Sequence, residues 1–493
     1  MSNDSAAPDV SRREFLGSAC CSAVGYTGLL STLASLRLTA TVASQSSPPP
    51  QTPDPRTQTP PRASAVLPDF KALVCLFLNG GNDANNMIVP IAEGPSSNAA
   101  SYAAYAAARS NLALPRTGLL PISPATSDGR SWALHAAMPE LQSLFGSGRA
   151  ALLGNVGTLV YPTTKAQYNA NSIPLPRQLF SHSDQQVQWQ NSVPDKTSTT
   201  GWGGRLADLL DASNADNKIS MSISIAGKNY FQVGRNVTQY AVSTGGAITF
   251  TGSTSAATSL DGMRFRGQRE LFTREQQGLF DTAFAGISGS AITNSELLTS
   301  VLSTAQPVNT VFPNTTAGNQ LRMAARLIAA SGNLGLRRQI FFVQLGGFDT
   351  HAAQLVNASP SSGAHADLLR QVSQAVNAFY AATEELGVAD RVTLFSSSDF
   401  GRTYRSNGDG SDHGWGNHQF IVGGAVKGGE LYGRMPNLTV NGPDDISQGR
   451  WIPTTSVDEY AATLASWFGV TPSNLPVVLP NIGRFAKPNL GFL

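Results

Sequence analysis

Residues 72–83 read ALVCLFLNGGND, an unbroken apolar run that ends in a turn of Asn and Gly followed by Asp83. A strand without polar alternation is buried on both faces, which is typical of a parallel sheet covered by helices. Three further apolar runs, each closed by polar residues, occupy 150–153, 340–345 and 392–395. The four runs together predict an α/β protein with a mostly parallel sheet.

The segments between the runs predict helices. Apolar residues recur at helical spacing through 366–386, between the third and fourth runs, and this predicts a βαβ crossover. Ser456 and Glu459 form a capping-box pattern before a predicted helix at 460–468. The range 213–315 is rich in Ser, Thr, Gly and Ala, so we expect an insertion or a cap over the sheet there.

The first 69 residues predict export rather than a folded core. Ser11-Arg12-Arg13-Glu14-Phe15-Leu16 is a twin-arginine sequence, and a mildly apolar run follows it. Residues 1–43 are therefore predicted to be a signal for the twin-arginine export machinery, and the mature protein to be periplasmic or secreted. Arg37 interrupts the apolar run, so no stable membrane anchor is expected. A Pro-rich linker is predicted at 44–69, ahead of a domain at 70–493.

Composition excludes several classes of function. The formal net charge is +2 and only 13% of residues are charged, so no electrostatic argument favours nucleic-acid binding. Beyond the predicted signal only Cys75 remains. A disulfide within the chain and a cysteine-based metal site are therefore not expected.

Acidic and imidazole side chains cluster where the predicted strands end. In an open α/β sheet, ligands bind beyond the carboxyl ends of the strands. Carboxylate and neutral imidazole together bind Zn²⁺ or Mn²⁺, and a larger share of oxygen ligands favours Mg²⁺ or Ca²⁺. Each residue could instead cap a helix, hold a turn or decorate a loop, but their joint occurrence predicts a divalent metal site. The candidate ligands are Asp83, Asp349, His351, Asp399, His413 and His418.

Five motifs are kept in one order over roughly residues 70 to 470. They are Gly80-Gly81-Asn82-Asp83, Ser181-His182, Gly346-Gly347-Phe348-Asp349-Thr350-His351, Ser398-Asp399-Phe400-Gly401-Arg402-Thr403 and Asp412-His413-Gly414. With these motifs the chain resembles the bacterial domain-of-unknown-function family 1501, which is itself similar to the alkaline phosphatase and sulfatase superfamily. This resemblance implies an alkaline-phosphatase-like fold and a two-metal hydrolase site.

The resemblance also implies catalytic roles. Ser181, with His182 beside it, corresponds to the superfamily's nucleophile at a helix start, although Ser181 could simply be a helix N-cap. Arg402 could bind the oxygens of an anionic substrate or pair with a carboxylate. Phe400 stands where the superfamily has a metal-binding His, so His413 or His418 would have to supply that ligand.

Two functions follow from these observations. The favoured function is an exported metal-dependent hydrolase that acts on an anionic phosphate or sulfate ester. The alternative is a non-catalytic exported envelope or secretion-associated protein that retains the hydrolase fold, and Phe400 is the residue that keeps it open.

Overall fold

The computed structural model describes residues 67, 69–126, 128–214, 218–274, 276–355, 359 and 361–493. The predicted signal at 1–43 and nearly all of the predicted linker at 44–69 lie outside the described residues. The described chain falls into two compact units. The smaller unit is Thr249–Glu296, and the larger unit contains the other described residues.

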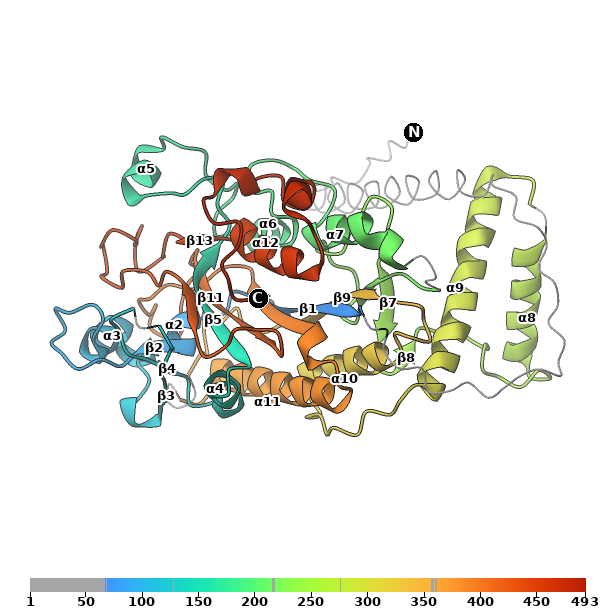
Figure 1. The fold of residues 1–493 in the computed structure, drawn as a ribbon, viewed down its shortest axis with the longest axis horizontal. Coiled ribbons are helices and arrows are strands. Elements are labelled where there is room, and N and C mark those ends of the chain that lie inside the picture. The colour runs from blue at the N-terminus through green and yellow to red at the C-terminus, as the bar shows by residue number, and fades with distance from the viewer. Residues whose placement is uncertain are drawn as a thin grey trace, which may run out of the picture. The chain divides into compact units, whose positions relative to one another are not determined.

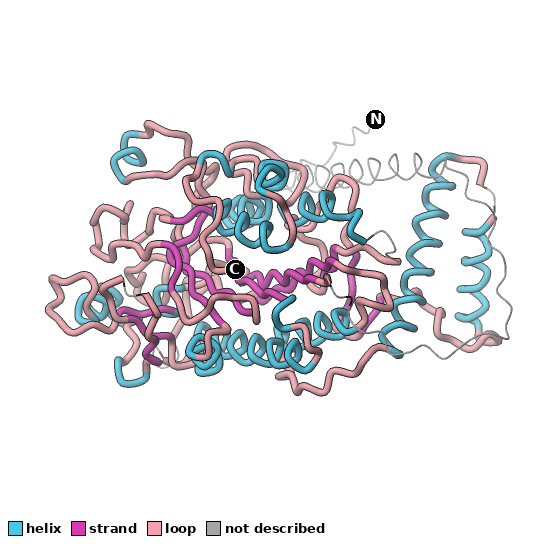
Figure 2. Tube along the Cα trace, in the orientation of Figure 1, coloured by secondary structure: helices cyan, strands magenta, loops and turns pink. Residues whose placement is uncertain are grey.

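A ten-stranded sheet forms the centre of the larger unit (Figures 1 and 2). Its central strand β1 pairs in parallel with β9 on one side and with β10 on the other. The antiparallel strand β11 then joins β10 to β5, so β5 runs in the same direction as β1. The strands in spatial order are β12 (Leu431–Gly433), β5 (Ala150–Gly157), β11 (Asn417–Gly423), β10 (Val392–Ser398), β1 (Lys71–Leu78), β9 (Arg338–Leu345), β6 (Ser222–Ser224), β7 (Tyr240–Ser243) and β8 (Gly246–Ala247), with β13 (Thr455–Ser456) paired to β5.

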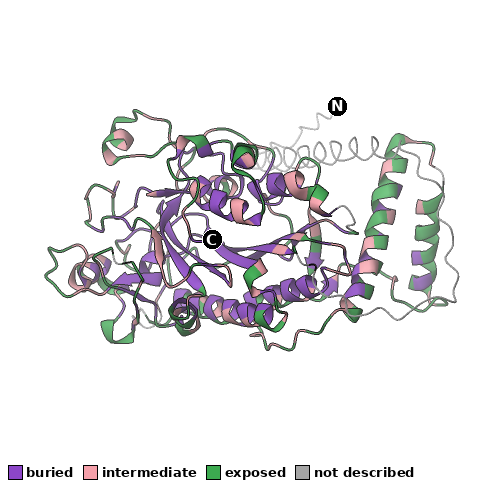
Figure 3. Cartoon of the chain, in the orientation of Figure 1, coloured by how far each residue is buried: buried purple, intermediate pink, exposed green. Residues whose placement is uncertain are grey.

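The four apolar runs of the sequence are β1, β5, β9 and β10, which confirms the predicted α/β class and the mostly parallel sheet. Every residue from 72 to 78 is buried, as are all residues of β5 and β10 (Figure 3). The absence of polar alternation in these strands is explained by helices on both faces of the sheet.

Helices cover each face of the sheet (Figure 1). The helix α11 (Ala364–Glu385) connects β9 to β10, which confirms the predicted crossover. It packs with α10 (Thr316–Ala329) and α4 (Pro139–Gly146) on one face. The opposite face carries α6 (His182–Asn191), α7 (Trp202–Leu210), α12 (Val457–Phe468) and α13 (Leu475–Val478).

The remaining elements lie at the periphery or in the smaller unit. A separate antiparallel sheet is formed by β2 (Ile88–Pro90), β4 (Trp132–Leu134) and β3 (Leu120–Ile122), close in sequence to the helices α2 (Ala84–Met87) and α3 (Tyr102–Arg109). The short helix α5 (Lys165–Ala170) follows β5. The smaller unit contains α8 (Leu260–Thr273) and most of α9 (Leu279–Thr304), within the range 213–315 where an insertion is predicted. None of the described helices combines the length and the apolar character needed to cross a membrane.

Candidate metal centre

The carboxyl ends of β1, β9 and β10 meet at one edge of the sheet, because the three strands are parallel neighbours in register. Asp349 and His351 follow β9, and His413 lies in the loop between β10 and β11. His182 is the first residue of α6, whose start contacts the same edge. The fold thereby brings together four side chains that are up to 231 positions apart in the sequence.

Three imidazoles converge on one carboxylate oxygen. The Nε2 atoms of His182, His351 and His413 lie 3.4, 3.2 and 3.4 Å from Oδ1 of Asp349. The potential ligand atoms of His182, Asp349 and His413 all lie within 4.8 Å of one another. His351 joins them, because its Nε2 is 2.7 Å from Nε2 of His413.

The other ring nitrogen of each histidine faces an acceptor. Nδ1 of His182 is 2.7 Å from Oδ2 of Asp399, and Nδ1 of His351 is 3.1 Å from Oδ1 of Asp412. Nδ1 of His413 is 2.6 Å from the carbonyl oxygen of Phe180. Ionised carboxylates and carbonyls only accept hydrogen bonds, so each Nδ1 carries a proton, and the neutral form of each ring presents its Nε2 lone pair to the centre.

This arrangement fits a metal ion. Three Nε2 atoms face Oδ1 of Asp349, which also accepts hydrogen bonds from Arg402, and Nε2 of His182 is buried without a hydrogen-bond partner among the described residues. Lone pairs at 2.7 Å repel unless a proton or a cation lies between them. Three imidazoles and one carboxylate form a ligand set of the kind that holds Zn²⁺ and related transition metals.

Charges around the centre keep Asp349 ionised. Partial burial acts to raise the pKa of Asp349, but the positive charge of Arg402 and the neighbouring imidazoles together hold that pKa below its ordinary value. Arg402 is buried and donates from Nη1 to Oδ1 of Asp349 at 3.0 Å and from Nε to the carbonyl of Ser411. Burial lowers the pKa of His413, which favours the neutral ring that a metal requires.

A cavity of about 300 Å³ adjoins the centre. His351 and His413 form part of its wall, together with Phe180 and Arg450. The guanidinium of Arg450 lies over the Phe180 ring, 5.6 Å from its centroid, and its Nε donates to the carbonyl of His413 at 2.7 Å. The cavity therefore combines a positive charge with an aromatic surface next to the candidate ligands.

The structure does not bring all six predicted ligands together. Asp83 is fully buried in an ion pair with Arg109 and also accepts a hydrogen bond from Gln354. Asp399 lies behind His182 and holds its Nδ1, rather than pointing its carboxylate into the centre. His418 is buried, with its Nδ1 accepting a hydrogen bond from the main-chain N–H of Asn155.

The three residues with predicted catalytic roles do not form one catalytic group in the structure. His182 lies in the centre as a candidate ligand, and Arg402 pairs with Asp349 instead of remaining open to an anion. The hydroxyl of Ser181 donates to Oδ2 of Asp184 at 2.7 Å, and no described hydrogen bond joins it to the centre. Its role as nucleophile stays a prediction.

Phe400 has a structural role that the sequence did not indicate. Its ring packs against the rings of His182 and His413, with centroids 4.8 and 4.6 Å away. The residue that departs from the superfamily pattern thus forms a wall of the candidate centre. Sequence reasoning also missed the acceptors Asp412 and the Phe180 carbonyl, although Asp412 directly precedes a candidate ligand and could have been considered.

The fold and the site together define an α/β protein with a candidate metal centre at the carboxyl edge of its sheet. The chain belongs to the family described as "Protein of unknown function (DUF1501)", whose model matches residues 70–477. This confirms the family that the motifs indicate. A search of curated proteins found no match.

Solved structures of similar fold are distant from this chain. The C-terminal periplasmic domain of EcEptC from Escherichia coli, in complex with Zn, is 13% identical with a TM-score of 0.35, covering 85% of this chain and 87% of that one. The PsFucS1 sulfatase from Pseudoalteromonas sp. is 12% identical with a TM-score of 0.32, covering 83% and 69%. The lipoteichoic acid synthase LtaP from Listeria monocytogenes is 8% identical with a TM-score of 0.33, covering 85% and 79%. Likeness at this level assigns no residue role to this chain.

Proposed function

We propose that this protein is an exported metal-dependent hydrolase of phosphate or sulfate esters. The convergence of His182, His351 and His413 on Asp349 is the observation that carries the proposal. A divalent ion held by these four residues would act as a Lewis acid toward an ester oxygen. The imidazole-rich ligand set favours Zn²⁺ or Mn²⁺ over Mg²⁺ or Ca²⁺.

The chain's own residues supply the rest of the proposed site. Asp399, Asp412 and the Phe180 carbonyl hold the three rings in the tautomer that presents Nε2. The charge of Arg450 at the cavity wall suits an anionic substrate, and the Phe180 ring suits an organic group attached to the ester. Export is proposed from the twin-arginine sequence alone.

The first test measures metal content in protein purified without chelator. We expect stoichiometric metal in the wild type and its loss in the His351→Gln/His413→Gln double variant, because two of four ligands are removed. Asp390→Asn, which changes an exposed carboxylate elsewhere, should keep the metal. A wild-type protein without stoichiometric metal would overturn the proposal.

The second test measures hydrolysis of an aryl phosphate and an aryl sulfate. Activity should require the metal and vanish in the double variant. If Ser181 is the nucleophile, Ser181→Ala should lower kcat by several orders of magnitude while the metal is retained. Full activity in Ser181→Ala would remove that residue from the mechanism. A metal-loaded wild type inactive on both esters would favour the non-catalytic alternative.

A further inference from the structure

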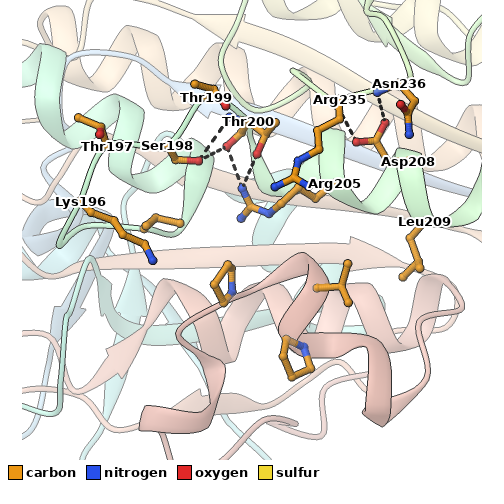
Figure 4. Close-up of a pocket in the computed structure, with 14 residues that line it drawn as sticks. Lys196, Thr197, Ser198, Thr199, Thr200, Arg205, Asp208, Leu209, Arg235 and Asn236 are labelled. Atoms are coloured by element: carbon orange, nitrogen blue, oxygen red, sulfur yellow. Dashed lines mark hydrogen bonds between the residues drawn. The ribbon is translucent and has the colours of Figure 1, made fainter.

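A second cavity, of about 680 Å³, lies away from the candidate centre and shares no lining residue with it (Figure 4). It is bounded by the segment that follows α6, by α7, and by residues 476–480 at and after α13. Its volume is within the range of sites that bind small organic molecules. No residue of the proposed hydrolase site contributes to it.

A buried arginine that forms no ion pair within 4.0 Å, among the described residues, lines this cavity. Arg205 is 8% exposed, and the described acceptors of its guanidinium are neutral, although the nearby carboxyl of Asp458 acts to raise its pKa. Nε donates to the carbonyl of Val478 at 2.7 Å, Nη1 to the carbonyl of Thr200 at 2.8 Å, and Nη2 to the carbonyl of Asn191 at 2.6 Å. Burial lowers the pKa of Arg205 to about 10, so the side chain keeps its charge at neutral pH.

Two further cations line the same cavity. Lys196 and Arg235 are exposed, and among the described residues neither forms an ion pair within 4.0 Å. Figure 4 shows Arg235 beside Arg205, and Lys196 on the neighbouring segment. Three positive charges therefore line one concave surface.

Asp208 is the single acidic residue in the lining, and its carboxylate is hydrogen-bonded to the main chain. The carboxylate of Asp208 accepts hydrogen bonds from the main-chain N–H groups of Arg235, Asn236 and Val237, at 2.6 to 2.9 Å. These bonds fix the turn that carries the Arg235 side chain, and Asp208 forms no ion pair with Arg235 or Arg205 among the described residues. The charges of the lining are thus three positive and one negative.

Hydroxyl groups complete the lining. Thr197, Ser198 and Thr199 are consecutive, and none of the three is buried. Guanidinium and ammonium groups bind phosphate and sulfate oxygens, and hydroxyls exchange hydrogen bonds with a polar organic group. The volume exceeds what a free inorganic anion fills, so the lining suits an anion attached to a polar organic body.

We propose that this cavity binds a small polar organic anion that carries a phosphate or sulfate group, at a site separate from the candidate metal centre. Lys196, Arg205 and Arg235 supply the charges that bind the anion. The hydroxyls of residues 197–199 contact the organic part. This proposal stands independently of the proposed hydrolase activity, because the two sites have no residue in common.

The test is calorimetric titration of the full chain with glucose 6-phosphate, and with glucose as the uncharged control. Wild type should bind glucose 6-phosphate and not glucose, and rising salt should weaken the binding. Lys196→Gln/Arg235→Gln should raise Kd by about tenfold or more, since two charge-assisted contacts to the anion are lost. Both side chains are exposed, so this variant is expected to fold, unlike a change at the buried Arg205.

Two comparison variants show whether binding belongs to this cavity. Lys228→Gln/Arg322→Gln removes the same charge from exposed positions elsewhere and should leave Kd within about twofold. His351→Gln/His413→Gln should also leave Kd unchanged. Absence of binding by wild type, equal weakening by the Lys228/Arg322 pair, or loss of binding only in the histidine variant would each overturn the proposal.

Discussion

At the scale of the residue, the hydrogen bond made by Nδ1 of each histidine determines the direction in which Nε2 can bind a metal. A ring whose Nδ1 donates to a fixed acceptor presents Nε2 in one direction, and the acceptor also makes the ring a better ligand. His182, His351 and His413 each have such an acceptor: two of these, Asp399 and Asp412, lie in the loop between β10 and β11, and the third is the carbonyl of Phe180 ahead of α6. The orientation of the candidate ligands therefore depends on residues that need not touch the metal.

Asp399→Asn tests this dependence. The change removes the negative charge that faces Nδ1 of His182, and the hydrogen bond to Asp399 is the main reason why the pKa of His182 is raised. We expect metal affinity to fall by about 10- to 100-fold, the usual effect of losing such a partner. Competition with a chelating dye measures it, with Asp390→Asn as the control. Unchanged affinity would show that Asp399 does not support the centre.

A second residue-scale prediction concerns the buried pair of Asp83 and Arg109. Burial acts to raise the pKa of Asp83, but the charge of Arg109 and the hydrogen bond from Gln354 hold it below the ordinary value. Arg109→Met would leave the carboxylate buried without its partner, so the free energy of unfolding should fall by about 3–5 kcal/mol. Urea denaturation at neutral pH measures this loss.

The same pair also tests the expected role of Asp83. Adding Asp83→Asn to Arg109→Met should recover part of the lost stability, because the unpaired charge is removed. Both variants should retain metal. Loss of metal in the folded double variant would instead support Asp83 as a ligand, as the sequence motif implies.

The sequence identifies the chemically important residues better than their partners. Asp349, His351 and His413 could be selected because they follow strands or lie in a Gly-rich loop. The pairing of Asp83 with Arg109 could not be predicted, because nothing in the sequence around Arg109 indicates that its side chain, at the end of α3, is buried. Burial and ion pairing depend on packing between distant segments, which local patterns do not encode.

At the scale of the element, the turns after β1 and β9 are packed against each other. Gly80 has φ of +116°, and a Cβ atom placed there would lie 2.4 Å from the main-chain nitrogen of Asp349. Only glycine therefore allows the turn after β1 to approach the loop that carries two candidate ligands. Gly80 of the first motif is thus explained by close backbone approach, whereas a Cβ atom at Gly81 would meet the Phe400 ring.

Gly80→Ala should displace the loop after β9. We expect a loss of about 1–3 kcal/mol in unfolding free energy and a weaker affinity for metal, since Asp349 would shift. Gly408→Ala is the matched control, because Gly408 also has a positive φ, of +111°, but a Cβ atom there would have no neighbouring atom within 4 Å. If both variants bind metal as wild type does, the contact between the two turns does not position Asp349.

Long elements could be predicted from the sequence, and short ones could not. β1, β9, β10 and α11 have continuous apolar or helical patterns. The strands β6, Ser222–Ser224, and β12 have three residues each, and β13 has two. Such strands exist because a neighbouring strand offers free hydrogen-bonding groups, so their positions follow from the assembled sheet rather than from local sequence.

At the scale of the whole molecule, one buried carboxyl links stability to pH. Burial raises the pKa of Asp458, near the start of α12, to about 7, although the charge of Arg205 acts against the rise. The folded state therefore holds a proton that the unfolded chain releases near pH 4. The stabilising contribution of this proton is complete below pH 4 and is lost as pH rises through about 7.

Asp458→Asn should remove this dependence. Relative to wild type, the variant should gain unfolding free energy as pH rises from 4 to 8, by roughly 4 kcal/mol over the full range. Denaturant unfolding at a series of pH values measures the difference, and Asp390→Asn, at an exposed site, should show no trend. A constant difference between Asp458→Asn and wild type across this range would contradict the assignment.

The central position of β1 has a consequence for synthesis. β1 pairs with β9 and β10, and roughly 270 residues separate its start from that of β9. At roughly 5–20 residues per second, a ribosome needs on the order of 15–50 s to make that interval. During this time an apolar strand that is destined for the middle of the sheet has neither of its neighbours. The nascent chain must keep this segment from aggregating until the last third of the protein emerges, so we expect a holding chaperone to bind near residues 71–78 during translation.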